Sequence, residues 1–235
     1  MKTILLKCAG PLQAWGTASY FESRMTDLYP SKSAIIGLLA ACCGFRRDED
    51  AEIQKLNDLN FAVRVDRQGT LLRDYHIAQK YKNSGAFDRT YVTNRYYLQD
   101  AIFIVSLAHD DEHLLDRLVE AIKAPYFQPF MGRRSLPVPA DFLIGTFEGS
   151  PLEVLETYPA QGLVSVAGET HKTLTVYADA QLCADQHGHQ WRQDVPLSFN
   201  QKNRQFGYRL EGKTRLTVPI RQAATEHDAF GAIGG

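Results

Sequence analysis

The sequence predicts an α+β fold, because runs with the hydrophobic patterns of strands and of helices alternate along the chain. Four segments have the length and apolar character of strands: 2–8, 61–65, 101–108 and 142–147. Two segments between them have those of helices: 34–43 and the segment that begins at Asp110. Their order, strand–helix–strand–strand–helix–strand, is the ferredoxin-like order shared by many RNA-recognition domains.

The helix over 34–43 carries recognisable start and stop signals. Ser31 and Ser33 are N-cap candidates, and Gly44 can end the helix because glycine tolerates a left-handed backbone. The segment is apolar nearly all round its axis, so we expect it to be packed inside a core. A short charged stretch over 48–57 is compatible with a second helix.

The later elements have signals of the same kind. In the segment 61–65, apolar residues alternate with polar or small ones, which predicts a half-buried strand. The segment 101–108 is apolar throughout, as expected of a fully buried strand. The helix that begins at Asp110 has acids in its first turn, Lys123 in its last turn and Pro125 just beyond, which suits the helix dipole and the helix end.

An insertion separates the second and third strands of this order. Residues 71–77 have a strand pattern, whereas residues 80–94 are polar and aromatic without a helical period. We therefore expect an exposed hairpin or a mobile loop there, with the insertion itself at about 79–99.

The chain after residue 150 is predicted to be rich in strands. Short strand signals separated by turns lie at 164–166, 174–178, 206–210 and 216–220. We expect three parts: a ferredoxin-like domain over 1–149 that carries the insertion, a β-rich part over 150–222 and a tail over 223–235.

The composition is that of an ordinary globular protein. The 235 residues include 26 Lys and Arg against 27 Asp and Glu, and 44% are hydrophobic, which excludes a disordered chain and a disulfide-dense secreted module. The longest apolar run, 34–43, is far shorter than the roughly twenty residues of a membrane span. No signal-peptide pattern follows Met1, and the four cysteines form no CxxC pair, so we expect a cytoplasmic protein.

Charge is segregated along the chain despite the small net charge. Residues 64–95 contain seven basic residues against three acids, and residues 202–221 contain six against Glu211 alone. Six aromatic residues are interleaved with the bases of the first run: Tyr75, Tyr81, Phe87, Tyr91, Tyr96 and Tyr97. Either run could be ordinary solvated surface. Stacking combined with phosphate contact is nevertheless how single-stranded nucleic acid is held, so the first run favours RNA binding.

Four candidate RNA contacts lie near the first helix. The loop 10–16 has two glycines that permit close approach to a phosphate, but it lacks P-loop spacing and could equally serve only to turn the chain. Within it, Gln13 and Trp15 could bind a base, although Trp15 could equally fill the core. Lys32 lies in the first helical turn, where a cation is unfavourable unless an anion binds, and Arg24 lies in the polar loop before it.

The insertion supplies a second group of candidate RNA contacts: Arg73, Tyr75, His76, Lys80 and Arg95. Strand alternation places Tyr75 and His76 on opposite faces. His76 could be a general base for attack by an RNA 2′-hydroxyl, assisted by Tyr75 or Lys80, or it could simply pair with Asp74. Because no complete set of acid, base and cation is recognisable, we expect RNA contact and no catalytic residue.

Two further segments carry side chains that suit a binding site. Arg133 and Arg134 follow Gly132 and present two guanidinium groups that suit a phosphate or an acidic surface of a partner. His187 and His189 could begin a metal site, but no third ligand is evident and an exposed turn is the default reading. We expect no metal and no cofactor.

Five segments, in this order and spacing, resemble one known family: 9–16 (AGPLQAWG), 30–41 (PSKSAIIGLLAA), 72–76 (LRDYH), 95–101 (RYYLQDA) and 131–137 (MGRRSLP). The family is that of the CasD subunits of type I-E CRISPR Cascade complexes, in the RAMP superfamily. The resemblance covers residues 2–147 well, with a weaker match at 218–222.

The resemblance implies an RNA-recognition-like palm with a protruding thumb hairpin. It implies a structural subunit in antiviral defence that grips the 5′ handle of the CRISPR RNA and contacts the backbone and large subunits. Target DNA is then met only indirectly, and RNA cleavage belongs to another subunit. Two other functions stay open from the residues alone: a metal-independent CRISPR repeat endoribonuclease that uses His76, and an unrelated RNA-binding module.

Overall fold

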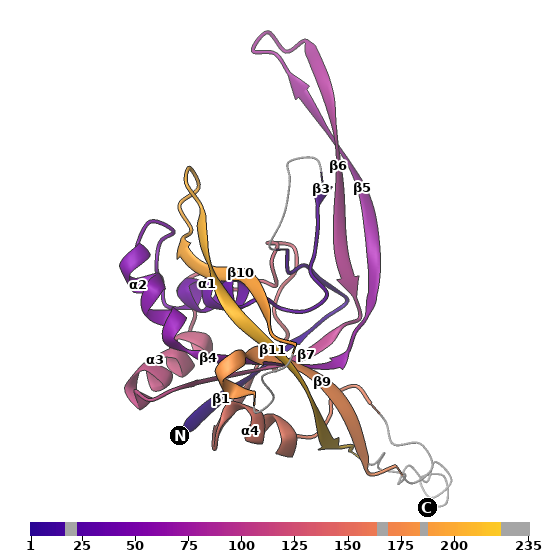
Figure 1. Cartoon of the computed structure of the whole chain (residues 1–235). Helices are drawn as coiled ribbons and strands as arrows, with labels where there is room; N and C mark the ends of the chain where they lie inside the picture. Colours follow the sequence, from indigo (N-terminus) through magenta and orange to yellow (C-terminus); the bar gives the residue numbers. More distant parts are fainter. Residues whose placement is uncertain (17–22, 164–168, 184–187, 222–235) are drawn as a thin grey trace, which may run out of the picture.

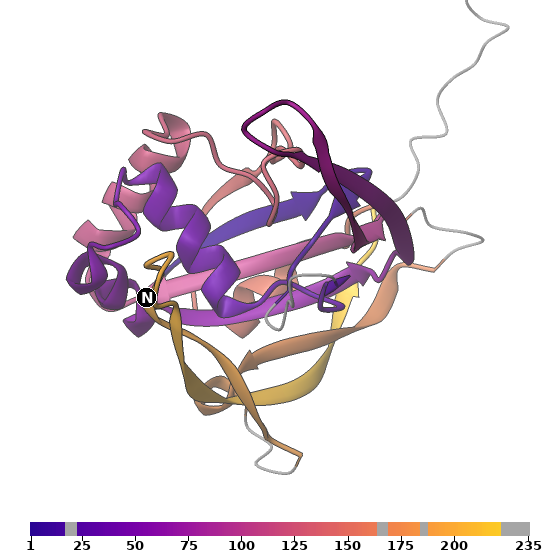
Figure 2. The same ribbon diagram turned by 90° about the horizontal axis from the view of Figure 1, so that it is seen from above.

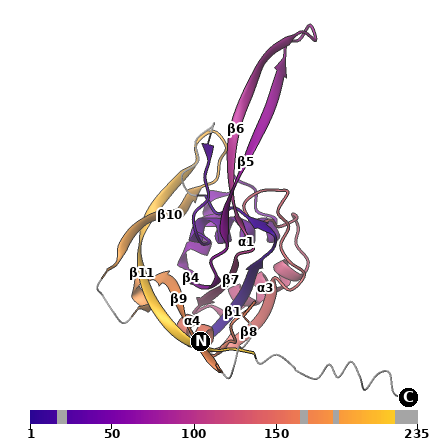
Figure 3. The same ribbon diagram turned by 90° about the vertical axis from the view of Figure 1, so that its right-hand side faces the viewer.

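The computed structural model describes residues 1–16, 23–163, 169–183 and 188–221. It is a mixed α/β structure in which helices cover a sheet, and a long β-hairpin projects from the body of the molecule (Figures 1 and 3). Across these residues, no helix combines the length and the apolar character that crossing a membrane requires.

Within the described residues, seven strands form the main sheet, in the order β10-β11-β9-β4-β7-β1-β8. Its predicted members are four neighbours: β4 (Asn60–Arg67), β7 (Ile102–His109), β1 (Lys2–Ala9) and β8 (Leu143–Glu148). β1 pairs antiparallel with β7 and β8, and β4 pairs antiparallel with β7. The predicted order of elements is confirmed, since α1 (Lys32–Cys42) lies between β1 and β4 and α3 (Glu112–Lys123) lies between β7 and β8.

The predicted helix signals act as expected. Ser31 is the N-cap of α1 and its side chain accepts a hydrogen bond from a backbone N–H of the first turn, whereas Ser33 lies inside the helix. Gly44 follows α1 with a φ of 83°, a left-handed conformation that glycine adopts without strain. Asp111 caps α3 in the same way as Ser31 caps α1. The charged stretch forms α2 (Asp50–Lys55) and a 3-10 turn, η1 (Leu56–Asp58).

Both faces of the central sheet are covered. α1 and α3 pack on one face against residues such as Ile4 and Phe61, and α1 crosses the strands in the view from above (Figure 2). On the other face, α4 (Pro151–Thr157) packs against Leu5 and Ala62. The prediction of a half-buried strand at 61–65 is therefore wrong, because α4, which we did not predict, buries the second face of β4.

Arg64 shows the consequence of that second layer. It is fully buried, and its Nε donates to Asp66 at 2.6 Å. Its Nη1 donates to the carbonyl groups of Leu155 and Tyr158 at the end of α4, where the helix dipole favours a cation. Arg64, the first residue of the predicted basic run, thus connects β4 to α4 in the interior and contributes no surface charge.

The insertion is a hairpin of β5 (Thr70–Tyr81) and β6 (Phe87–Gln99). Of the two alternatives for residues 80–94, the exposed hairpin is the one observed. It begins at Thr70, before the expected start near residue 79, because the whole predicted strand at 71–77 pairs with β6. Two short strands, β2 (Leu12–Gln13) and β3 (Ser23–Arg24), pair with β6 near its base.

The C-terminal strands extend the same sheet: β9 (His171–Asp179), β10 (Gln190–Ser198) and β11 (Gln205–Pro219). β9 pairs with β4, and the predicted strand at 174–178 lies within it. The strands predicted at 206–210 and 216–220 are one strand, β11, because the polar residues between them also pair with β9. β10 was not predicted. The expected strand at 164–166 and the tail at 223–235 lie outside the described residues.

Candidate nucleic-acid interface

A groove of about 1160 Å³ runs over the exposed side of α1. The middle of α1 forms its floor, through small residues such as Ala34 and Gly37. One wall is the segment 127–133 together with β3, and the opposite wall is the turn between β10 and β11. In Figure 1 the β10–β11 turn rises on one side of α1 and the β5–β6 hairpin on the other. The groove exceeds the usual 300–1,000 Å³ of a small-molecule pocket, so it has room for an extended ligand.

The groove is strongly positive. Five of the described residues that line it are arginines, and none is an acid: Arg24, Arg46, Arg47, Arg133 and Arg204. Five others are phenylalanines: Phe45, Phe127, Phe130, Phe199 and Phe206. Guanidinium groups bind phosphates, and flat rings stack on bases, so this combination suits single-stranded nucleic acid.

Hydrogen bonds to the C-terminal end of α1 hold the wall formed by the segment 127–133 against the floor of the groove. The backbone N–H groups of Tyr126 and Phe127 donate to the last carbonyl groups of α1, at 2.9 and 3.1 Å. The ring of Tyr126 lies against Gly44, where an added Cβ would be 2.9 Å from its Cγ. Phe127 therefore faces the groove, and Arg46 and Arg47 follow the same helix end on its rim.

The guanidinium group of Arg133 binds backbone carbonyl groups of the chain, whereas the sequence predicted that it and Arg134 would bind a phosphate together. Its Nη2 donates to the carbonyl groups of Arg24 and Tyr96, each at 2.9 Å, and its Cζ lies 4.1 Å from the centroid of the Tyr97 ring. The preceding Gly132 has a φ of 86°, and a Cβ there would collide with the carbonyl oxygen of Ala14. Arg133 thus joins the wall of the groove to the base of the β5–β6 hairpin. Arg134, its expected partner in the fork, is exposed.

The β5–β6 hairpin has two unlike faces. Residues opposite one another on paired strands share a face, so Tyr75 and Ile77 lie with Val92 on one side, and all three are exposed. His76 and Arg95 lie on the other side, which is partly buried. Arg73 lies on the same face as Tyr75, so this face presents exposed apolar side chains beside a guanidinium group.

The three hairpin side chains considered for RNA cleavage, Tyr75, His76 and Lys80, lie apart from one another. Tyr75 and His76 lie on opposite faces, as the alternation predicted, and Lys80 lies about 13 Å along the strand from His76 at 3.3 Å per residue. Lys80 pairs with Asp88 at 3.4 Å, and the guanidinium of Arg73 donates to the side-chain oxygen of Asn94. Tyr75 and His76 are thus separated across the hairpin, and Lys80 is separated from His76 along it.

Two candidate base contacts, Gln13 and Trp15, are buried and lack the exposure that a base contact requires. The Gln13 side chain is fully buried and donates to the carbonyl groups of Ala101 at 2.7 Å and Cys8 at 3.3 Å. Its oxygen accepts from the indole N–H of Trp15 at 3.0 Å, and Trp15 is 1% exposed. Of the two readings of Trp15, core packing beneath the groove is the one observed. Both side chains shape the loop 10–16, and neither presents a free edge to a base.

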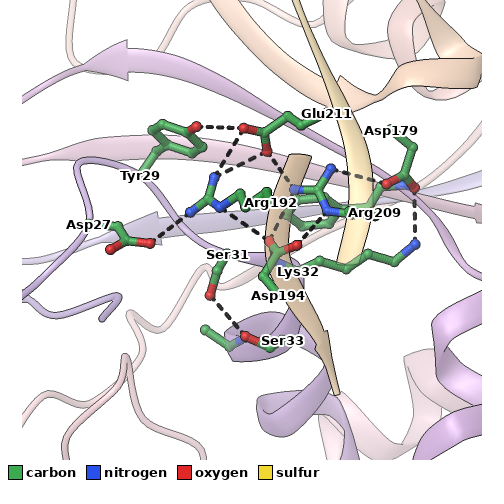
Figure 4. A network of polar contacts seen from close by, with 12 residues as sticks. Asp27, Tyr29, Ser31, Lys32, Ser33, Asp179, Arg192, Asp194, Arg209 and Glu211 are labelled. Carbon is green, nitrogen blue, oxygen red and sulfur yellow. Dashed lines mark hydrogen bonds and ion pairs between the residues drawn. The ribbon is translucent and has the colours of Figure 1, made fainter. Parts of the chain in front are cut away.

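Lys32 is also buried, which corrects the surface position that a phosphate contact requires. Its ammonium lies 3.0 Å from Asp179, and its backbone N–H donates to Asp194 at 2.9 Å (Figure 4). The negative charge expected at the first turn of α1 is therefore supplied by carboxylates of the chain itself and not by a phosphate. This pairing could not be read locally, because Asp179 and Asp194 are far away in the sequence.

Around Lys32 the charges form a closed set, which we call the buried network: Asp27, Tyr29, Lys32, Asp179, Arg192, Asp194, Arg209 and Glu211 (Figure 4). Arg209 donates to Asp194 at 2.7 Å and to Asp179 at 3.2 Å. Burial opposes the charge of Arg209, yet Asp194 and Glu211 hold its pKa above the ordinary value. The network ties the N-terminus of α1 to β9, β10 and β11.

The comparisons with known proteins decide the family. The model of the CRISPR-associated Cas5 family matches residues 3–210. This chain belongs to the Cas5 family. The CasD subunit of the Cascade CRISPR system of Escherichia coli K12 is 34% identical over 175 residues, which span 68% of this chain and 78% of that protein. The resemblance found in the sequence motifs is thus confirmed.

Two solved structures are similar to the whole Cas5 chain. One, a chain of a CRISPR RNA-guided surveillance complex, has a TM-score of 0.80 at 29% identity and covers 97% of this chain and 96% of its own length. The other, a crystal structure of a Cas protein, has a TM-score of 0.66 at 32% identity and covers 93% and 98% respectively.

The sequence signals missed several residues of this Cas5 groove. Arg204 lies in the second basic run, but that run also contains the buried Arg209, and a charge count does not distinguish them. Phe206 lay in a predicted strand, and no sequence signal marked Phe199. The doublet Arg46-Arg47 directly after a predicted helix end was the signal that could have been used.

The described part of this Cas5 chain holds no group of three or more His, Cys, Asp or Glu side chains that could bind a metal ion. Of the two histidines weighed for such a site, His187 lies outside the described residues and His189 is partly buried.

Proposed function

We propose that this Cas5 chain is a structural, RNA-binding subunit of a Cascade-type CRISPR RNA-guided complex, and that it holds the 5′ handle of the CRISPR RNA in the groove over α1. The observation that carries the proposal is the composition of that groove. Five arginines and five phenylalanines line it, without one acid among its described residues. The similarity to a chain of a CRISPR RNA-guided surveillance complex supports the same assignment.

The proposed architecture is a ferredoxin-like palm over 1–149 with a thumb, the β5–β6 hairpin, and a β-rich part over 150–222. The neighbouring strands β4-β7-β1-β8, with α1 and α3 on one face, support the palm. The pairing of β9 with β4 implies that the two parts share one sheet.

The arginines that remain open to a ligand support phosphate binding. The guanidinium groups of Arg24, Arg46, Arg47 and Arg204 form no hydrogen bond or ion pair with any described residue. Unpaired guanidinium groups lose little when they bind a phosphate, because no internal partner has to be displaced. We keep Arg134 and the hairpin residues Arg73, Tyr75, His76, Lys80 and Arg95 as further proposed contacts.

We propose a binding role and not RNA cleavage. A metal-independent endoribonuclease needs a base, an acid and a cation around one phosphate. The separation of Tyr75, His76 and Lys80 along β5 argues against that arrangement. The exposed apolar side chains of the hairpin, Tyr75, Ile77 and Val92, support contact with a neighbouring protein subunit, for which we propose the backbone and large subunits of the complex.

The test is RNA binding by the Arg46→Ala, Arg47→Ala double variant. The wild-type chain should bind a CRISPR repeat RNA, and the variant should lose two phosphate contacts, which reduces the slope of log affinity against log salt by about 1.4. A Lys172→Ala, Arg215→Ala variant removes the same charge from the exposed surface of β9 and β11 and should keep the wild-type slope.

Two outcomes would contradict the proposal. An unchanged slope in the groove variant would remove the groove from RNA binding. Cleavage of the repeat RNA by the pure wild-type chain in EDTA would replace the binding role with the nuclease alternative.

A further inference from the structure

The turn between β10 and β11 forms one wall of the groove, and its Arg204 belongs to the second basic run of the sequence. Phe199 follows β10, and Phe206 lies at the start of β11. Their ring centroids are 6.2 Å apart with an angle of 69° between the ring planes. Both rings line the groove, and both are only partly buried. An edge-to-face pair at a groove wall leaves ring surface available to a third flat group.

Phe199 anchors this pair to the floor of the groove. A Cβ at Gly37 of α1 would lie 3.3 Å from its Cζ, so the ring rests directly on the helix where the helix has no side chain. A larger residue at position 37 would push Phe199 away and fill part of the floor. Phe206 packs on Phe199 but is not the ring that contacts α1 at Gly37.

The end of β10, which leads into the wall, is anchored from behind. Gln54 of α2 donates to the carbonyl group of Leu197 at 2.7 Å, and Asn57 of η1 donates to that of Pro196 at 2.9 Å. Within the turn, the Asn200 side chain accepts from the N–H of Lys202 at 2.9 Å. A preformed wall lowers the conformational entropy that a ligand would otherwise lose on binding, so it favours a binding surface.

Arg204 completes the wall with a positive charge. It is exposed directly before β11, lines the groove as Phe206 does, and forms no hydrogen bond or ion pair with the described residues. A ring and an unpaired guanidinium two residues apart match one nucleotide, because its base can stack while its phosphate is bound.

We propose that Phe206 stacks on one unpaired base of the RNA in the groove and that Arg204 binds an adjacent phosphate, with Phe199 as the support of Phe206. This proposal rests on the proposed function and adds the β10–β11 wall to it. A single aromatic platform reads no base identity, since every base has a π face. It sets the register of the strand by holding one nucleotide in place.

The experiment places 2-aminopurine at each position of the 5′ handle of a CRISPR repeat RNA and measures its fluorescence with the full chain. Wild-type protein should quench one position. Phe206→Leu should abolish that quenching and weaken binding by about tenfold with an unchanged salt slope, and Phe206→Trp should restore both. Arg204→Ala should lower the salt slope by about 0.7. Tyr208→Leu, at an exposed residue of β11 that does not line the groove, is the matched control.

The outcomes separate this inference from the proposed function. If Phe206→Leu keeps the quenching and affinity while the Arg46, Arg47 double variant binds weakly, the RNA lies in the groove without using this wall, and the inference is wrong. If neither variant changes binding, the proposed function fails as well. Loss of quenching in Tyr208→Leu to the same extent would also overturn the inference, because the effect would not be specific to the wall.

Discussion

The two ends of α1 use the same kind of charge in opposite ways. At its N-terminus, Lys32 and the network arginines Arg192 and Arg209 are each paired with carboxylates and are mostly buried. Beyond its C-terminus, Arg46 and Arg47 line an open groove that has no carboxylate among its described residues. The cations are similar, so the difference lies in the carboxylates. In this fold, a basic residue that pairs with an internal carboxylate stabilises the structure. A basic residue without such a partner among the described residues is available to bind a ligand.

The largest expected effect comes from breaking the buried network at Asp194. This fully buried carboxylate accepts from Arg209 and from the first N–H of α1. Asp194→Ala removes the carboxylate that Arg209, Arg192 and the first N–H of α1 share and leaves excess positive charge in the interior, so we expect a loss of about 3–5 kcal/mol in the free energy of unfolding, measured by urea denaturation. The exposed Glu148→Ala is the control, expected within about 0.5 kcal/mol of the wild type. A cost for Asp194→Ala below about 1 kcal/mol would show that the network is not a stabilising unit.

Lys32→Met sharpens the same comparison with a smaller effect. Asp179 would keep Arg209 and the backbone N–H of Phe61 as partners, so we expect a loss of about 2 kcal/mol in the free energy of unfolding. Because the ammonium is buried, the salt slope of RNA binding should stay at the wild-type value. A slope reduced by about 0.7 would instead return Lys32 to the phosphate-binding surface.

Arg133→Ala tests an arginine at the junction of the groove and the hairpin. The change removes hydrogen bonds to the carbonyl groups of Arg24 and Tyr96, which should cost about 1–2 kcal/mol in stability. Amide exchange should become faster at the base of β6, around residues 94–98, and should stay unchanged in α3. Unchanged exchange in β6 would mean that Arg133 does not position the hairpin.

Arg134→Ala should have the smallest effect on stability. Its side chain is exposed, so we expect the free energy of unfolding to change by less than about 0.5 kcal/mol. If Arg134 is the ligand-binding member of the pair, the salt slope of RNA binding falls by about 0.7 in this variant. Equal stability losses in Arg133→Ala and Arg134→Ala would contradict the division of roles that the structure indicates.

The sequence by itself determined the order of the central elements, the position of the inserted hairpin and the family motifs. These features depend on local patterns: hydrophobic period, the N-cap Ser31, the left-handed Gly44 and the alternation that separates Tyr75 from His76. Each is decided within a few residues, so each is readable along the chain.

Only the tertiary structure decided which charges face a ligand. Arg64, Lys32 and Arg209 lie in promising sequence contexts, yet each meets acids in the interior. Asp179 lies 147 residues from Lys32 in the sequence, and the groove combines residues from Ala14 to Phe206. A charge count records how many cations a segment has. Whether a cation is neutralised depends on carboxylates that other strands bring to it, and that is fixed by the packing of the whole sheet.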